Sequence, residues 1–241
     1  MSFTLCLDFG NTRRKAAVFQ DGNIIRHINL ENDLADIQSL LQEYKPATSI
    51  LSSVVNHLEE IEALLKANTR FHLLSHQSKL PFTTPVNKPD TIGTDRLALA
   101  AAAVHLHPNK NNLVIGLGTC ITYNFINNKH EFIGGAISPG MEMRFKAMNQ
   151  FTAKLPLAKA DWNVPVIGYD TQTNLTSGVV MGISLEVDGF INEYQQRFGN
   201  FNVLLTGGDI RFLGSHIKNK IFADPDLIFK GLYAISVVNN V

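Results

Sequence analysis

The sequence has few cysteines and carries no excess of either charge. Only two cysteines, Cys6 and Cys120, occur among the 241 residues, which argues against a disulfide framework, and neither has the neighbours of a metal cluster. Both are expected to be buried thiols. Lys and Arg together number 21, as do Asp and Glu. This balance removes the electrostatic reason to expect a nucleic acid or an anionic membrane as a partner.

Long apolar runs and targeting features are also lacking. No run reaches the roughly 18 apolar residues needed to cross a bilayer. The first residues lead almost directly into "FTLCLDFG", without the basic segment, apolar core and small-residue cleavage site of a signal peptide. We therefore expect a cytoplasmic protein. Its length allows one large domain or two compact lobes.

The apolar pattern predicts an α/β protein without a low-complexity linker. Helical spacing covers residues 34–44, 58–67, 141–151, 174–198 and 227–238. Buried strands are predicted at 48–55 and 202–209. Apolar runs on either side of Asn127, Asn128 and Lys129 indicate a hairpin. The first half of the chain thus alternates strands and helices after its opening strands.

A short internal repeat relates the two halves of the chain. When Gly10 is placed on Gly118, "LCLDFGNT" aligns with "LVIGLGTC", and each is an apolar strand followed by glycine and small polar side chains. Two similar lobes that open with a β-hairpin facing a shared cleft are typical of the actin-like ATPase and sugar-kinase class. We predict an N-terminal lobe at 1–110 and a C-terminal lobe at 111–241.

Such turns suit phosphate binding. Glycine lets backbone N–H groups approach phosphate oxygens, and neighbouring Thr or Asn side chains add donors. Asp8 is then a ligand for Mg²⁺, while Lys15 or Arg14 balances phosphate charge. A third glycine turn, at 206–209, also follows a strand. The alternative for residues 8–11 is a tight turn with an Asx hydrogen bond.

One motif makes the interpretation more specific. "GTDR" opens an Ala-rich helix between the first turn, "DFGNT", and the second, "GLGTCIT", and "GGAISPG" and "FTAKLP" follow. This ordered set resembles the type III pantothenate kinases over nearly the whole chain. The resemblance implies a duplicated, ribonuclease H-like (actin-like) α/β fold with two lobes around a nucleotide cleft. It also implies a homodimer and ATP-dependent phosphorylation of pantothenate to 4'-phosphopantothenate, the first step of coenzyme A biosynthesis.

The resemblance also assigns roles to individual residues. Asp95 resembles the general base that takes the proton of the pantothenate hydroxyl, and Arg96 resembles a ligand of pantothenate, because guanidinium offers a planar fork of donors. Other positions that match substrate residues are Gly93, Thr94 and Thr171. The positions that match ATP-binding residues are Asp8, Gly10, Asn11 and Thr12 in the first loop, and Gly118, Thr119 and Thr122 in the second. Lys15 and the glycines of the third turn, Gly207 and Gly208, are expected to bind ATP on the residue types alone.

Asp95 also has a simpler interpretation as an N-terminal helix residue beside a solvated Arg96. In either case the helix dipole is expected to keep the pKa of Asp95 low. A low pKa suits late proton acceptance, which agrees with the loose transition state of phosphoryl transfer.

Two positions depart from the family pattern. Gly116 stands where the family carries an aspartate associated with a monovalent cation, which leaves a requirement for K⁺ or NH₄⁺ open. The segment "TPVNKPDTIG" lacks the tyrosine that the family carries shortly before its Gly-x-Asp-Arg motif. One wall of the pantothenate pocket is therefore expected to differ.

These departures keep two other functions open. One is a non-catalytic regulatory relative of the same fold, and the other is a small-molecule kinase that phosphorylates a different hydroxyl. Retention of both Asp8 and Asp95 favours the pantothenate kinase, because these residues match the metal ligand and the base. The eight histidines form no convincing metal-binding pattern.

Overall fold

The computed structural model describes residues 2–161 and 163–239, and the chain divides into two compact units. The first comprises residues 1–109, 126–133 and 226–241, and the second comprises residues 110–125 and 134–225. The C-terminal segment thus packs with the N-terminal residues. The lobe boundary predicted between residues 110 and 111 concerns the duplicated sequence and stays a prediction.

The first unit contains a five-stranded sheet in the order β3-β2-β1-β4-β5. Its strands are β1 (Phe3–Phe9), β2 (Arg14–Gln20), β3 (Asn23–Asn29), β4 (Thr48–Ser53) and β5 (Arg70–Leu73). β1 is antiparallel to β2 and parallel to β4. Asp8 consequently lies between Lys15 on one neighbour and Ser52 on the other.

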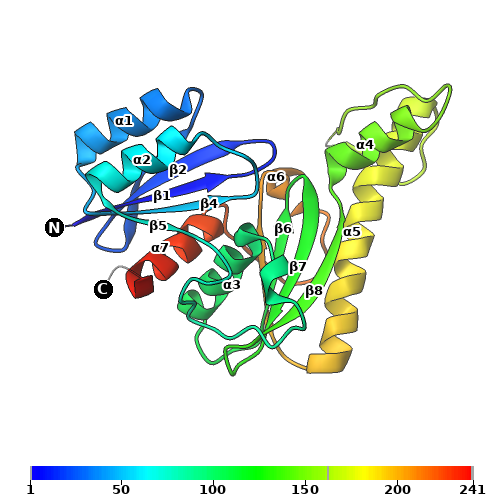
Figure 1. Ribbon diagram of the computed structural model, residues 1–241. Helices are drawn as coiled ribbons and strands as arrows, with labels where there is room; N and C mark the ends of the chain where they lie inside the picture. The colour runs from blue at the N-terminus through cyan, green and yellow to red at the C-terminus, as the bar shows by residue number, and fades with distance from the viewer. Residues whose placement is uncertain (1, 162, 240–241) are drawn as a thin grey trace. The chain divides into compact units, whose positions relative to one another are not determined.

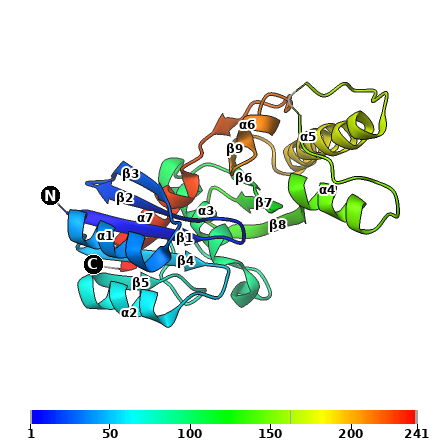
Figure 2. The ribbon, with the colours of Figure 1, turned by 90° about the horizontal axis from the view of Figure 1, so that it is seen from above.

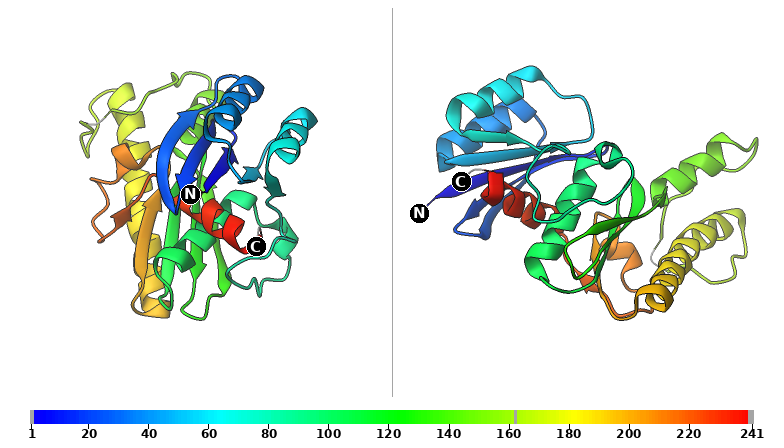
Figure 3. Two further views of the ribbon diagram at one scale, coloured as in Figure 1. Left: turned by 90° about the vertical axis from the view of Figure 1, so that its left-hand side faces the viewer. Right: turned by 60° about the horizontal axis from the view of Figure 1, so that its bottom comes forward.

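Helices cover both faces of this sheet (Figures 1 and 3). On one face lie α1 (Asp33–Tyr44) and α2 (Glu59–Asn68), and on the other lie α3 (Thr94–Leu106) and α7 (Leu227–Asn239). A short 3-10 turn, η1 (Pro89–Thr91), precedes α3. The alanines of α3 permit its close packing against α7, because a small side chain brings two backbones together.

The limits of α1 follow from local chemistry. The Asn32 side chain accepts a hydrogen bond from the N–H of Ala35 and caps the N-terminus. At the other end Lys45 adopts the left-handed conformation, with φ of 45°, and Pro46 follows. The prediction of a helix over residues 34–44 is confirmed to within one residue.

The second unit repeats the sheet of the first. Its five strands have the order β10-β9-β6-β7-β8. They are β6 (Asn112–Leu117), β7 (Cys120–Ile126), β8 (Phe132–Pro139), β9 (Asn202–Thr206) and β10 (Phe222–Ala223). When β6 is placed on β1, the two sheets have the same strand order. The internal repeat found at Gly10 and Gly118 therefore reflects a duplicated topology.

The second unit contains the helices α4 (Met141–Gln150), α5 (Thr171–Phe198) and α6 (Ile210–Leu213) (Figure 2). α5 begins three residues before the predicted start, because Asp170 and Thr173 form a capping box. Its apolar face, including Ile183 and Val187, packs against the sheet in one core cluster.

The helices formed by residues 2–161 and 163–239 include none that combines the length and apolar character of a membrane span.

Candidate active site

The first glycine turn joins β1 to β2 in the first unit. Gly10 donates its N–H to the carbonyl of Arg13 at 3.0 Å, which closes the turn. Val54 donates to the carbonyl of Phe9 at 3.0 Å and attaches the end of β4 to the same turn. Asn11 and Thr12 are exposed at its tip, as a phosphate-binding role requires.

Asp8 lies directly before this turn and is mostly surrounded by protein. Burial raises its pKa to about 7, Lys15 on β2 opposes this rise, and the charge of Asp95 adds to it. The two carboxylates therefore lie close enough to interact. The negative charge of Asp95 therefore makes ionisation of Asp8 less favourable.

Asp95 lies in the first turn of α3. Burial raises its pKa, while the N–H of Arg96, the charge of Arg96 and the N–H of Asp95 itself lower it. The predicted low pKa is therefore wrong, because loss of hydration outweighs the helix terminus. A Cβ on Gly93 would lie 2.5 Å from Asp95 Oδ1, so glycine at this position leaves room for the carboxylate.

The neighbours of Asp95 are held by other parts of the first unit. The guanidinium of Arg96 lies over the ring of Phe132, with Cζ 5.5 Å from the ring centroid. Ser52 Oγ donates to Thr94 Oγ1 at 3.0 Å, and Thr94 Oγ1 donates to the carbonyl of Ser53 at 3.2 Å. The predicted residues Asp8, Gly93, Thr94 and Asp95 thus meet around the ends of β1 and β4.

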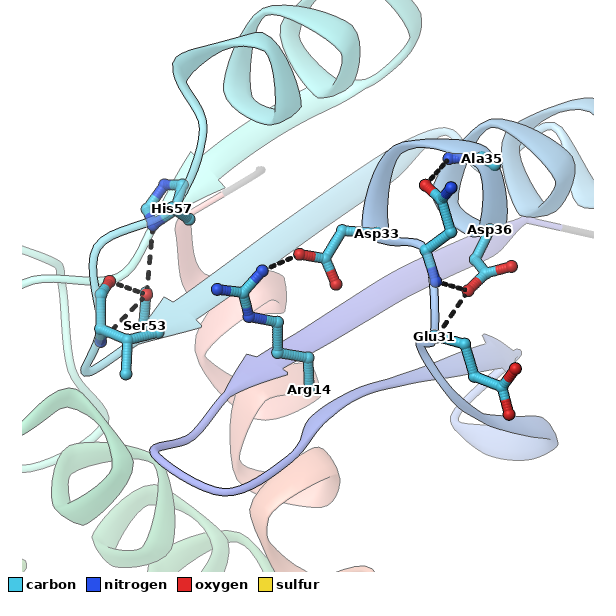
Figure 4. Close-up of polar contacts among 9 residues, drawn as sticks. Arg14, Glu31, Asp33, Ala35, Asp36, Ser53 and His57 are labelled. Carbon is cyan, nitrogen blue, oxygen red and sulfur yellow. Dashed lines mark hydrogen bonds and ion pairs between the residues drawn. The ribbon is translucent and has the colours of Figure 1, made fainter.

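A pocket of about 530 Å³ opens beside the first turn, also within the first unit. Its lining residues are Gly10, Asn11, Thr12, Arg13, Arg14, Asn29, Leu30, Glu31, Asp33 and Val55. Figure 4 shows that Arg14 extends toward Asp33, with which it forms an ion pair, while His57 contacts Ser53. Arg14 is therefore engaged at the pocket wall, and Lys15 is the cation that faces Asp8.

The second glycine turn lies in the second unit and joins β6 to β7. Gly118 donates its N–H to the carbonyl of Cys120 at 3.2 Å, and Gly118 and Thr119 are exposed. Gly140 donates to the carbonyl of Thr119 at 3.0 Å and attaches the start of α4 to the turn. Gly207 approaches the Leu117 backbone from β9, with φ of 109°.

Close approach explains the glycine at position 207. A Cβ there would overlap the carbonyl of Leu117, and an L-residue rarely adopts this backbone conformation. Gly208 is exposed, and a Cβ added there would meet open space. The second and third predicted loops, at 118–122 and 206–209, are therefore brought together within one unit.

Thr122 and Thr171 lie in different settings in the second unit. Thr122 is buried in β7, where its Oγ1 accepts a hydrogen bond from Asn124 Nδ2 at 3.2 Å. Thr171 is exposed at the first turn of α5, after the Asp170 cap. Their predicted contacts with ATP and pantothenate stay predictions.

Sequence reasoning missed the serines that end β4. Ser52 is fully buried and Ser53 is partly buried, and both contact Thr94. Their signal was available, because Ser52 and Ser53 follow Ile50 and Leu51 at the carboxyl end of a predicted strand, where ligands commonly bind in open α/β sheets.

A second missed group surrounds Glu186 in the second unit. Glu186 accepts hydrogen bonds from Tyr123 at 2.9 Å and Ser138 at 2.5 Å, and it pairs with Arg144. Burial opposes ionisation, but these partners lower the pKa of Glu186. Nothing in the local sequence pattern marked this group.

Oxygen ligands are available for a divalent cation at Asp8. Among residues 2–161 and 163–239, no three His, Cys, Asp or Glu side chains form a group able to hold a metal. Asp8 with Asp95 nearby fits Mg²⁺, which commonly binds through one or two carboxylates plus waters and substrate phosphates.

The duplicated sheets and the glycine turns define the class of protein. Among solved structures, a protein assigned to the Baf family of transcriptional activators, from Campylobacter jejuni, is 24% identical with a TM-score of 0.64, covering 98% of each chain. A glucokinase from an Antarctic psychrotroph is 11% identical with a TM-score of 0.53, covering 99% of each chain. The fold is that of the actin-like ATPases and sugar kinases, as predicted.

The family follows from the sequence comparisons. The model of the type III pantothenate kinase family matches residues 4–193. A type III pantothenate kinase from Flavobacterium johnsoniae is 39% identical over 231 residues, which is 95% of each chain. Another from Christiangramia forsetii is 40% identical over 238 residues, or 98% of each chain. The chain belongs to the type III pantothenate kinase family, which confirms the predicted family.

Proposed function

We propose that the protein transfers the terminal phosphoryl group of ATP to the primary hydroxyl of pantothenate. The observation that carries this proposal is the proximity of Asp8 and Asp95 in a chain that matches the family over nearly all of its residues. A regulatory relative would have no need to keep two interacting carboxylates, because a pair of this kind raises the cost of ionisation.

Asp8 is the proposed metal-binding residue of the first turn. The backbone N–H groups near Gly10, together with Asn11 and Thr12, are the proposed phosphate donors, and Lys15 offsets the negative charge. Mg²⁺ bound here would neutralise charge on the phosphate oxygens. The raised pKa of Asp8 implies that cation binding displaces a proton below about pH 7.

Asp95 is the proposed general base. Because burial raises its pKa, its carboxylate is a better proton acceptor than an ordinary exposed aspartate. Arg96 is the proposed partner of the pantothenate carboxylate or amide oxygens, and the ring of Phe132 supports its guanidinium. Gly93 lets the backbone approach the substrate.

In the second unit, Thr119 is the proposed ATP contact of the turn at 118–122. Its exposure and the neighbouring Gly207 and Gly208 support this assignment. Gly116 pairs with Thr206 in the sheet and offers no carboxylate. We therefore propose that the reaction does not depend on a side-chain site for K⁺ or NH₄⁺.

The test is phosphoryl transfer from ATP to pantothenate, with the product identified by mass spectrometry. Asp95→Asn is expected to lower kcat by about 10²- to 10⁴-fold, the usual contribution of a general base. Asp90→Asn, at an exposed residue of η1, controls for loss of a nearby negative charge. Equal rates with K⁺ and with tetramethylammonium are expected.

Two outcomes would contradict this function. Transfer to a different hydroxyl compound, but not to pantothenate, would establish another small-molecule kinase. Folded protein that transfers phosphate to no acceptor, under every cation tested, would favour a regulatory relative.

We also propose a homodimer formed through the second unit. Large apolar side chains are strongly exposed there, including Phe151 at 80%, Ile167 at 84% and Tyr169 at 81%. Exposed apolar side chains of this size are typical of an interaction surface. Because Thr171 is exposed at the start of α5, two residues after Tyr169, a second copy is the proposed route by which Thr171 reaches pantothenate.

Light scattering after size exclusion tests this assembly. The wild-type protein is expected at twice the chain mass, and Ile167→Glu is expected to give monomers because it buries a charge in the interface. Ile25→Glu, at a half-exposed apolar residue of β3, is the control. A monomeric wild type would refute the homodimer.

A further inference from the structure

The end of β4 connects the two carboxylates of the first unit. In the parallel pairing of β1 with β4, Asp8 lies opposite Ser52. Ser52 is fully buried, so its hydroxyl needs a partner inside the protein. That partner is Thr94 Oγ1, at 3.0 Å.

Thr94, in the first turn of α3, joins this helix to the end of β4 by hydrogen bonds. Its hydroxyl accepts the bond from Ser52 and donates its own proton to the carbonyl of Ser53 at 3.2 Å. Gly93 at the N-cap offers no side chain to the helix terminus. The two bonds of Thr94 therefore attach the first turn of α3 to β4.

Asp95 follows Thr94 directly and has little freedom of its own. Its Oδ1 atom would lie 2.5 Å from a Cβ on Gly93, and its carboxylate accepts hydrogen bonds from the first turn of α3. A shift of Thr94 relative to β4 would therefore move Asp95 relative to Asp8, because Asp8 belongs to the adjoining strand.

We propose that Ser52 and Thr94 are positioning residues that set the separation between Asp95 and Asp8. This inference rests on the proposed kinase function. Ser52 acts only through Thr94, since it is shielded from solvent and hence from substrate. The hydroxyl of Thr94 has this role in addition to the predicted place of Thr94 beside the substrate.

The effect is expected in kcat more than in KM. Misplacement of a reacting group by about 1 Å costs up to about 10²-fold in rate, whereas one lost hydrogen bond leaves the binding groups in place. We expect Ser52→Ala to lower kcat about tenfold. The KM values for ATP and pantothenate are expected to change less than about twofold.

Ser49 provides a matched control in the same strand. It is also fully buried, and its hydroxyl also bonds to a threonine at a helix terminus, Thr69 Oγ1 at 2.5 Å. It lies three residues from Ser52, toward the opposite end of β4. Ser49→Ala should therefore cost similar stability, while kcat stays within about twofold of the wild type.

A double-mutant cycle separates positioning from general loss of stability. Thr94→Val keeps the shape of the side chain but removes its hydroxyl, and Ser52→Ala is made in both backgrounds. If the two hydroxyls act through one bond, Ser52→Ala has almost no further effect on kcat once Thr94 is valine. Thr94→Ser, which keeps the hydroxyl, is expected to lose less activity than Thr94→Val.

Thermal unfolding of each variant identifies any that fail to fold. The inference is overturned if Ser52→Ala matches Ser49→Ala in kcat, or if the effects of Ser52→Ala and Thr94→Val on kcat are independent. Failure of the function itself gives a different result, because then the wild-type protein also transfers no phosphate to pantothenate.

Discussion

Asp8→Asn is expected to stabilise the protein in the absence of divalent cations. The substitution keeps the shape of the side chain and removes a carboxyl group whose charged form is disfavoured by burial. Burial raises the pKa of Asp8 from 3.8 to about 7, with Lys15 lowering it and Asp95 raising it. The folded state therefore binds more protons than the unfolded state between about pH 4 and pH 7.

The size of the effect follows from that difference in pKa. At about 1.36 kcal/mol per pKa unit, a change from 3.8 to about 7 corresponds to at most about 4 kcal/mol. Part of Asp8 remains accessible to water, which makes this value an upper bound. The contribution of protonated Asp8 to stability is fully present below pH 3.8 and is lost as pH rises through about 7.

Urea unfolding at a series of pH values, without metal, measures this contribution. The free energy of unfolding of Asp8→Asn minus that of the wild type is expected to be smallest near pH 4 and largest above pH 7. Asp90→Asn, at an exposed carboxylate on η1, controls for the change in net charge. A difference that does not vary with pH, or that shrinks as pH rises, would refute the reasoning about Asp8.

Two other substitutions test the second unit. Gly207→Ala is expected to cost at least about 2 kcal/mol in urea unfolding, because its Cβ would overlap the Leu117 carbonyl at a φ of 109°. Gly208→Ala, with open space around it, is the control, and equal losses would contradict the prediction. Glu186→Gln is expected to lower stability by about 1.5 to 3 kcal/mol through its weakened pairing with Arg144. That loss should diminish as pH falls and protonates wild-type Glu186, and a loss that persists would argue against an ionic role.

The local pattern of the sequence was sufficient for most helices and strands. α1 and α2 follow the predicted ranges because apolar spacing acts over a few residues, and α1 also has a side-chain cap and a following proline. The repeat around Gly10 and Gly118 also predicted the duplicated topology, since each turn follows its own strand. The order of short motifs was enough to indicate the family.

Ends of elements were less accurate where side chains compete with the apolar pattern. β4 was predicted to reach residue 55 but ends at Ser53. At this end Ser52 donates a hydrogen bond to Thr94 Oγ1, and Ser53 donates one to the Val55 carbonyl. α5 starts early because Asp170 caps it.

The contacts around Asp95, and the pKa that results from its burial, could be found only in the tertiary structure. Ser52 and Thr94 are separated by 42 residues, and Tyr123 and Glu186 by 63. No local periodicity predicts such pairs, because each depends on how separate elements pack. The pKa of Asp95 was wrongly predicted for the same reason.

The sequence by itself determined most helices and strands, the repeated glycine turns and the family, because these depend on residues close together in the chain. Only the tertiary structure decided that α7 completes the first unit and that β4 links Asp8 to Asp95. It also decided how far burial shifts both carboxylates, since desolvation depends on every element packed around a charge.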